Sequence, residues 1–298
     1  MLKRILTASV LILIVFGTIF GLRLIHPAFV ACLVLIAELI ATHEMISAFT
    51  SLENKPMKCI LYPACVLISA LSFVCQYIKD INGNYISGYV GIFIALAIMT
   101  IAACAVFTFV HKYEIKDLLS TIFIMIYPIA IFASLIVMNN EIYGLYAILL
   151  TIIVPVMTDT MAYFTGISIG GKKLCPEISP KKTIAGAIGG VVGAMMGCII
   201  IFLLFDKFQV FASWNYVEKV AVKGSIGLQV TAYLVLGLIA GPVCEIGDLA
   251  ASWIKRKVGI KDYGKIFPGH GGVMDRIDSI LFMIPLTIIF TQFFLEVV

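Results

Sequence analysis

The sequence predicts an all-α, polytopic membrane protein with about nine transmembrane helices and a cytoplasmic N-terminus. Of its 298 residues, 61% are hydrophobic and only 13% are charged, whereas a soluble globular domain has roughly 45–50% apolar and about 25% charged residues. Apolar runs close to the ~18–20 residues that cross the hydrocarbon core recur along the whole chain. Most basic residues fall in the loops of one side. Together these observations argue against a water-soluble fold.

The apolar runs define nine predicted spans. The first follows Lys3 and Arg4, is longer than the apolar region of a usual signal peptide, and is not followed by a small-residue cleavage pattern, so we expect a retained helix. The predicted spans are approximately 5–25, 28–49, 59–78, 88–110, 118–138, 142–165, 183–205, 226–254 and 279–297.

The distribution of basic residues predicts the orientation. If the spans alternate, the N-terminus and the loops after the second, fourth, sixth and eighth spans share one side, and that side holds 16 of the 21 Lys and Arg residues. Because basic loops are retained in the cytoplasm, we expect the N-terminus inside and the C-terminus outside. Ten of the 16 lie in the last two of these loops, and without them the count is six against five, so the orientation depends on those loops.

Ionisable residues are distributed unevenly along the chain. The first five spans carry few, whereas the chain after about residue 142 is interrupted by them. We therefore expect an N-terminal scaffold of about five helices, 1–141, and a C-terminal region of about four helices that carries the chemistry, 142–298. No internal repeat supports the inverted-repeat plan of many secondary transporters.

Three polar residues interrupt the second span. Glu44 and His43 fall near its cytoplasmic end, where we expect them to be solvated. Glu38 lies deeper, and a carboxylate in mid-helix costs ~2.5–3.5 kcal/mol unless it faces a cavity or a partner. Glu38 is therefore a candidate supporting residue.

The seventh span carries glycines on one helical stripe. Small residues at this spacing let helices approach closely inside a membrane, so we interpret the stripe as a packing surface. The glycines are Gly186, Gly189, Gly190, Gly193 and Gly197.

A polar stripe follows the end of the eighth span. Glu245, Asp248, Ser252 and Lys255 are separated by three, four and three positions, so they share one face of a helix. Two carboxylates on such a face are costly against lipid. We therefore expect this face to line a watery cavity or to coordinate a cation.

The loop that follows contains a tight turn and leads into further acids. Pro268, Gly269, Gly271 and Gly272 surround His270 and predict a bare-backbone turn that can approach a ligand closely.

Asp275, Asp278 and Ser279 then fall on one face as the last helix begins. Carboxylates from two helix ends, framed by cations and a glycine turn, suit a polyphosphate bound with Mg²⁺, which prefers one or two protein carboxylates together with phosphate oxygens and water.

A third polar segment connects the sixth and seventh spans. Asp159 and Thr160 lie inside the sixth span, and paired lysines follow at 172–173 and 181–182. Lysines before a helix N-terminus combine charge with free backbone N–H groups, which suits an anion. Topology alone would also explain these lysines.

The run from Ser252 to Asp278 resembles the signature of phosphatidate cytidylyltransferases, the CDP-diacylglycerol synthases. It contains Ser-x-x-Lys-Arg, Lys-Asp-x-Gly, Pro-Gly-His-Gly-Gly and Asp-Arg-x-Asp in register. The resemblance extends upstream through 247–249, 178–183 and 159–164, and so covers roughly the C-terminal half. The N-terminal half resembles the family only in hydropathy.

This resemblance implies CTP and phosphatidic acid as substrates, with CDP-diacylglycerol and pyrophosphate as products. It also implies Mg²⁺ held by Asp248 and Asp275, a second cation beside it, and a homodimer in the bacterial inner membrane with its active site towards the cytoplasm. We expect no nucleic-acid partner. The matching catalytic residues are Ser252, Lys255, Arg256, Lys261, His270 and Arg276, and the matching substrate-binding residues are Ser179, Lys181, Lys182, Asp159 and Asp278.

Some positions depart from the family pattern. Met161 replaces a glycine, Ile167 stands where an arginine is common, Ile184-Ala185 replaces a usual Trp-Glu, and Ala251 replaces a glutamate. These departures concern the role of the loop between spans six and seven, and substrate preference.

The residues leave three functions to weigh. In the favoured one, a phosphatidate oxygen attacks the α-phosphorus of CTP without a protein nucleophile, so catalysis consists of positioning and charge neutralisation; His270 donates a hydrogen bond or only shapes the turn. A cation-coupled transporter is the alternative from another class, because acids such as Asp159 and Asp248 also mark ion pathways. The concentration of charge at cytoplasmic helix ends argues against it. A transferase acting on another lipid phosphate or lipid alcohol is the third.

Overall fold

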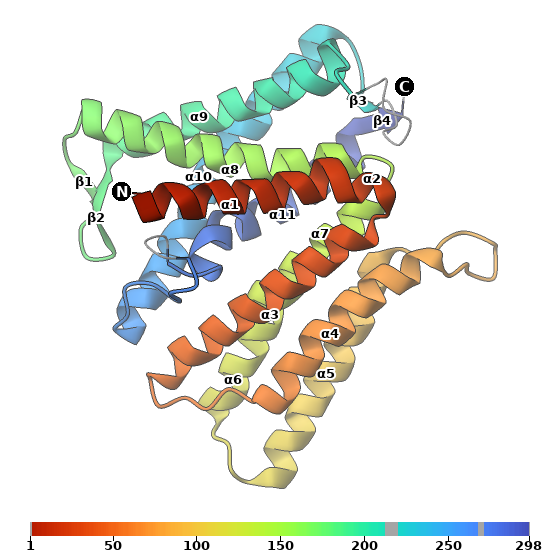
Figure 1. The fold of residues 1–298 in the computed structure, drawn as a ribbon, viewed down its shortest axis with the longest axis vertical. Coiled ribbons are helices and arrows are strands. Elements are labelled where there is room, and N and C mark those ends of the chain that lie inside the picture. Colours follow the sequence, from red (N-terminus) through yellow and green to blue (C-terminus); the bar gives the residue numbers. More distant parts are fainter. Residues whose placement is uncertain (1, 212–219, 268–270, 298) are drawn as a thin grey trace. The chain divides into compact units, whose positions relative to one another are not determined.

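The computed structural model describes residues 2–211, 220–267 and 271–297 (Figure 1). Within this part of the chain, eight helices are long and apolar enough to cross a membrane. This confirms the all-α, polytopic fold. The first predicted span is also helical, from Leu2 to Ile25.

The chain forms two compact units. The first contains Met1–Asn140 and Lys255–Ile277, and the second contains Glu141–Ile254 and Asp278–Val298. The end of one helix and the start of the next therefore belong to the first unit, although most of both helices belongs to the second.

The first unit is a bundle in which α3 packs against α4 and α7, and α4 packs against α5. Pro128 lies inside the π-helical turn η3, which joins α6 to α7 within the fourth long helix. The elements of this unit are α1 (Leu2–Gly17), η1 (Thr18–Leu22), α2 (Arg23–Ile25), α3 (Ala28–Thr50), α4 (Lys58–Val74), η2 (Cys75–Tyr77), α5 (Gly88–Val110), α6 (Ile115–Ile124), η3 (Met125–Ala130) and α7 (Ile131–Asn140).

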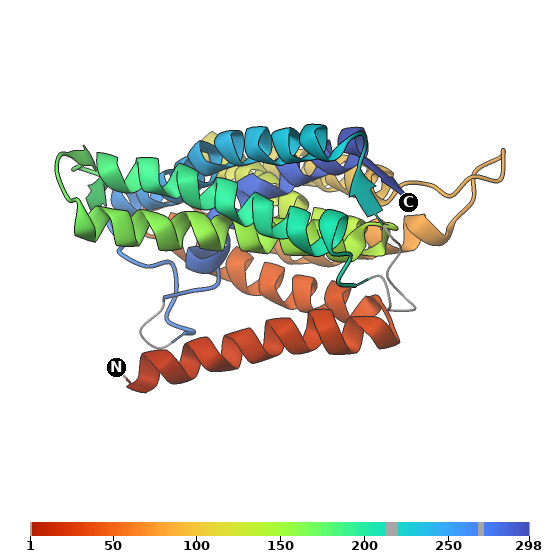
Figure 2. The same ribbon diagram turned by 90° about the horizontal axis from the view of Figure 1, so that it is seen from above.

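The second unit is built around a close pair of helices, α8 and α9, which run side by side in both views (Figures 1 and 2). Two small antiparallel sheets accompany its helices, β1 with β2 and β3 with β4. The elements are α8 (Gly144–Ser168), β1 (Lys173–Cys175), β2 (Ser179–Thr183), α9 (Ile184–Phe202), η4 (Leu203–Lys207), β3 (Val220–Val222), α10 (Ile226–Val258), α11 (Met274–Phe294) and β4 (Leu295–Val297).

Glycines explain the close approach of α8 and α9. A Cβ added at Gly193 would clash with the carbonyl of Met157, and one added at Gly186 would lie 2.9 Å from the carbonyl of Ala162. The backbones can meet only because these positions carry no side chain. This confirms the predicted packing stripe.

Two segments differ from the prediction. The segment 179–183 before α9 is a strand, and its Thr183 pairs with Lys173 of the neighbouring strand β1. The Thr183 hydroxyl also accepts a hydrogen bond from Gly186 N at 3.0 Å and so caps α9. The last helix begins at Met274, five residues before the predicted 279, because Asp275, Arg276 and Asp278 interrupt the apolar run near its start. It ends at Phe294, and 295–297 pairs with β3.

Candidate active site

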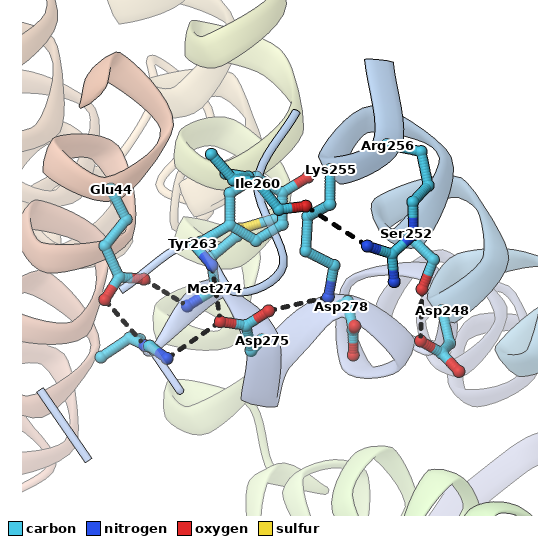
Figure 3. Close-up of polar contacts among 12 residues, drawn as sticks. Glu44, Asp248, Ser252, Lys255, Arg256, Ile260, Tyr263, Met274, Asp275 and Asp278 are labelled. Atoms are coloured by element: carbon cyan, nitrogen blue, oxygen red, sulfur yellow. Dashed lines mark hydrogen bonds and ion pairs between the residues drawn. The ribbon is translucent and has the colours of Figure 1, made fainter. Parts of the chain in front are cut away.

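A buried carboxylate organises the part of the signature that lies in the first unit. Asp275 Oδ1 accepts a hydrogen bond from Lys255 Nζ at 2.8 Å, and Asp275 Oδ2 accepts the backbone N–H groups of Tyr263 and Gly272, each at 2.9 Å (Figure 3). Lys255 Nζ also lies 5.4 Å from the centroid of the Tyr263 ring. Hydrogen bonds to the charged carboxylate of Asp275 are stronger than bonds between neutral groups. Asp275 therefore ties the end of α10 and the following loop to the start of α11.

A second buried carboxylate reaches the same backbone from α3. Glu44 Oε1 accepts the N–H of Val273 at 3.1 Å, and Glu44 Oε2 accepts the N–H of Met274 at 2.8 Å (Figure 3). These donors belong to the N-terminal turn of α11, where backbone N–H groups have no partner within the helix and favour negative charge. The prediction that Glu44 is solvated is wrong. Its side chain is only 3% exposed, because these two backbone donors replace water as the hydrogen-bond partners of the carboxylate.

The other polar residues of the second span have different environments. His43 is exposed, as expected, and its Nδ1 lies at hydrogen-bond distance, 2.8 Å, from the Tyr62 hydroxyl. Glu38 is fully buried and accepts a hydrogen bond from Ser69 Oγ at 2.6 Å. The carboxylate predicted to need a partner thus has one on α4.

The remaining predicted catalytic cations of the first unit are at its surface. Arg256, Lys261 and Arg276 are exposed, and Arg256 Nη1 donates to the carbonyl of Ile260 at 3.5 Å (Figure 3). His270 lies outside the described residues. Exposed guanidinium and ammonium groups beside a buried ion pair can reach an anionic ligand without losing a buried partner.

In the second unit, the predicted metal ligand Asp248 contacts Lys182, a predicted phosphate ligand. Lys182 Nζ on β2 lies 2.9 Å from Asp248 Oδ2, and Ser252 Oγ donates to Asp248 Oδ1 at 3.3 Å (Figure 3). The hairpin that carries the lysines therefore lies against α10. Lys181, one position earlier on β2, is exposed, and Ser179 opens the same strand.

One turn before Asp248, Glu245 is 6% exposed, and its Oε1 has no hydrogen-bond partner within the described part of the chain. A Cβ at Gly190 would overlap with this oxygen. Gly190 thus makes room for a carboxylate as well as for helix packing, a role that its place in the glycine stripe did not reveal.

Asp159 and Asp278 complete the predicted substrate-binding set. Asp159 is exposed on α8. Asp278 is buried in α11 and its Oδ1 accepts the N–H of Ser279 at 2.8 Å. A Cβ at Gly247 would lie 3.0 Å from the carbonyl of Asp278, so α10 and α11 pack closely at this position.

Two of the departures from the family pattern lie at packed positions. A Cβ at Gly193 would lie 2.7 Å from the Cβ of Met161, so Met161 packs into the α8–α9 contact. Ala251 is fully buried on α10. Nothing in the structure explains Ile167, Ile184 and Ala185.

The donor chemistry fits a cation bound together with phosphates. Within the residues that the structure describes, no three His, Cys, Asp or Glu side chains form a group that could hold a metal ion by themselves. Mg²⁺ does not require such a group, since it takes one or two carboxylates and completes its coordination with phosphate oxygens and water. Asp248 and Asp275 each supply carboxylate oxygens, and each is neutralised by a lysine, Lys182 and Lys255 respectively.

Residues 2–294 match the model of the cytidylyltransferase family. The chain belongs to this family. The match includes the N-terminal half, in which the sequence resembles the family only in hydropathy, so the relationship extends over nearly the whole chain.

Several curated relatives of the chain are named phosphatidate cytidylyltransferase. The chain is 39% identical over 158 residues to the phosphatidate cytidylyltransferase of Brucella abortus biovar 1 (strain 9-941), which is 53% of this chain and 51% of the relative. It is 38% identical over 147 residues to the phosphatidate cytidylyltransferase of Bacillus subtilis (strain 168), 49% of this chain and 48% of the relative. The matches thus span about half the length of these relatives.

Proposed function

We propose that this protein is a phosphatidate cytidylyltransferase, which transfers CMP from CTP to phosphatidic acid and gives CDP-diacylglycerol and pyrophosphate. The observation that carries this proposal is the pairing of the two signature carboxylates, Asp248 and Asp275, with Lys182 and Lys255 in a member of the cytidylyltransferase family. Two polyanionic substrates and a divalent cation require carboxylates that can bind the cation and lysines that can bind phosphates.

The reaction needs no protein nucleophile. A phosphate oxygen of phosphatidic acid forms a bond to the α-phosphorus of CTP, and the bond from that phosphorus to the bridging oxygen of the β-phosphate breaks, so that pyrophosphate leaves. Catalysis then consists of bringing two anions together and neutralising their charge. Bound Mg²⁺, held by Asp248 and Asp275, would supply part of that neutralisation on the triphosphate.

The lysines and arginines supply the rest. Lys182 and Lys255, which pair with these carboxylates, would bind phosphate oxygens of the substrates. Arg256, Lys261 and Arg276 are already exposed and bind phosphates directly. Ser252, beside Asp248, and His270 complete the proposed catalytic set.

The same proposal includes several further features. Ser179, Lys181, Asp159 and Asp278 contribute to substrate binding, a second cation binds beside Mg²⁺, and the protein is a homodimer. The resemblance to the family supports these features. The excess of Lys and Arg in one set of loops supports a location in the cell (inner) membrane with the site towards the cytoplasm.

A substrate panel tests the proposal. Purified protein is incubated with labelled CTP and Mg²⁺, with phosphatidic acid, with diacylglycerol, with a different lipid phosphate, or without lipid. We expect pyrophosphate release and a labelled lipid only with phosphatidic acid, and loss of both after chelation of Mg²⁺. Turnover with diacylglycerol or another lipid phosphate instead would identify a related transferase, and absence of pyrophosphate in every arm would favour the transporter.

A further inference from the structure

We propose that Glu44 is a positioning residue for the cytidylyl transfer. In this inference, which rests on the proposed function, Glu44 holds the loop before α11 so that Asp275 is correctly placed, and it touches neither substrate nor metal. It lies on α3, 229 residues before its partner Val273.

The first observation is the two-point contact with backbone. The two oxygens of Glu44 accept the consecutive N–H groups of Val273 and Met274, and the side chain is buried. A carboxylate that binds through both oxygens fixes the position and the direction of the backbone it holds. Since these N–H groups open α11, Glu44 fixes the point at which the helix begins.

A second, independent observation is the room made for this carboxylate. A Cβ at Gly264 or at Gly272 would overlap with Glu44 Oε1. Neither glycine has a positive φ angle, so the turn itself does not require glycine there. The absence of a side chain at these two positions is explained by the Glu44 carboxylate, which fills the space.

Glu44 acts on Asp275 through the shared backbone. The N–H of Gly272 is accepted by Asp275, and the next two N–H groups are accepted by Glu44 (Figure 3). Three consecutive donors are thus divided between the two carboxylates. If Glu44 releases its two donors, the turn that carries Gly272 is no longer fixed, and Asp275 loses the precise geometry of its own bonds.

Substitution of Glu44 should therefore impair turnover through a local change. Glu44→Gln keeps the size and one acceptor oxygen but turns an amide N–H₂ towards a backbone donor, and Glu44→Ala removes both acceptors. Because misplacement by about 1 Å can cost ~10²-fold in rate, we expect kcat to fall about 10-fold for Glu44→Gln and about 10²-fold for Glu44→Ala. Glu53→Gln is the matched control: it makes the same change at an exposed carboxylate just after α3, and we expect kcat to change less than twofold.

Hydrogen exchange separates positioning from a general loss of structure. In Glu44→Ala, the amides of Val273 and Met274 should exchange faster, together with those of the preceding loop, while α4 and α5 keep their protection. Faster exchange throughout the helices of the first unit would assign Glu44 a merely structural role and would overturn the inference. So would unchanged exchange at Val273 and Met274.

The overlap between an added Cβ at Gly264 and the Glu44 carboxylate permits a double-mutant cycle. Gly264→Ala should lower turnover at least 10-fold in the natural background, because the added Cβ displaces the Glu44 carboxylate. In the Glu44→Ala background the same change should cost less than threefold, since the space is then empty, and residues in contact show this kind of non-additivity. Losses that multiply would contradict the inference.

A failure of the inference about Glu44 can be distinguished from a failure of the proposed function. If the unsubstituted protein releases no pyrophosphate from CTP with phosphatidic acid, the proposed function fails, and hydrogen exchange still measures whether Glu44 holds the loop. If the unsubstituted protein is active and Glu44→Ala retains its activity, only the inference about Glu44 fails.

Discussion

Each acid of the candidate site has defined donors, and this decides what its substitution removes. Asp275 accepts one charged and two backbone donors, whereas Asp248 pairs with Lys182 and Ser252. A change at such a residue, or at its lysine, can remove a charge needed for the reaction and a bond needed for the structure. At the exposed Arg256, the loss of charge is accompanied by the loss of a hydrogen bond at the surface rather than of a buried ion pair.

Lys255→Gln and Arg256→Gln should therefore differ. Both remove a positive charge that relieves repulsion between the substrates, so both should lower turnover strongly while membrane insertion stays intact. Lys255 is buried against Asp275, and breaking a buried ion pair costs ~3–5 kcal/mol. Lys255→Gln should therefore lower the thermal midpoint in detergent more than substitution of the exposed Arg256 does. Near-normal turnover in both variants would leave these residues a topological role only.

Asp248 and Asp275 should behave as one functional pair if they hold the same Mg²⁺. Asp→Asn at either position keeps the size and should lower turnover by at least ~10²-fold, the scale seen when one charge-stabilising group is lost. Once the ion is lost, the second substitution has little left to remove, so the double variant should be nearly as active as the worse single one. Rates at saturating Mg²⁺, with insertion checked and with the exposed Glu177→Gln as control, test this. Multiplicative losses would refute a shared metal.

The sequence predicted the types of residue in the site but not all of their partners. The polar face from Glu245 to Lys255 follows from helical spacing alone. The sequence also indicates both Lys182 and Asp248, which the structure brings within 2.9 Å of each other. Glu44 was expected to be solvated because a carboxylate near the end of a span normally reaches water. Its partners are backbone N–H groups 229 residues away, and no local pattern in the sequence identifies them.

At the scale of elements, the helices were predictable and the short strands were not. Long apolar runs predicted seven of the eight long helices to within a few residues, because the hydrophobic thickness of a bilayer sets their length. The β1–β2 hairpin has two short strands, Lys-Leu-Cys and Ser-Pro-Lys-Lys-Thr, and is held by only a short ladder, so no apolar alternation reveals it. The start of α11 was placed too late for a related reason: Asp275 and Asp278 lie among its first five residues, and they end an apolar run but not a helix.

The α8–α9 contact can be tested with one methyl group. Gly193→Ala places a Cβ against the carbonyl of Met157, which is backbone and cannot rotate away, and overpacking of this kind typically costs ~1–3 kcal/mol. We expect a lower thermal midpoint in detergent. Gly227→Ala makes the same change in α10, where no atom lies within 4 Å of the new Cβ, and should not lower it. An equal fall in both variants would mean that the glycine stripe is not the reason for the close packing.

At the scale of the whole molecule, the signature is shared by the two compact units. Glu245, Asp248 and Ser252 lie in the second unit, whereas Lys255 and Asp275 lie in the first. The first unit also contains the rest of the segment Lys255–Ile277 and the N-terminal helices, which carry few ionisable residues. Its Glu44 nevertheless accepts hydrogen bonds from Val273 and Met274 of the signature loop, so the contacts of this loop extend to the N-terminal half of the chain.

The orientation in the membrane is the remaining property of the whole chain that can be tested directly. Ten of the 16 basic residues on the predicted cytoplasmic side lie in the two loops that also carry the proposed phosphate ligands, so their number reflects chemistry as well as topology. Labelling separates the two. In a cysteine-free background, Lys261→Cys and Lys181→Cys should be protected from an impermeant reagent added to intact cells, and Lys223→Cys should be labelled. Lys223 and Lys261 flank the single helix α10, Ile226–Val258, so they face opposite sides whether or not the first helix crosses the membrane. Labelling at 261 with protection at 223 would reverse the orientation and place the site outside, where the proposed nucleotide substrate is absent.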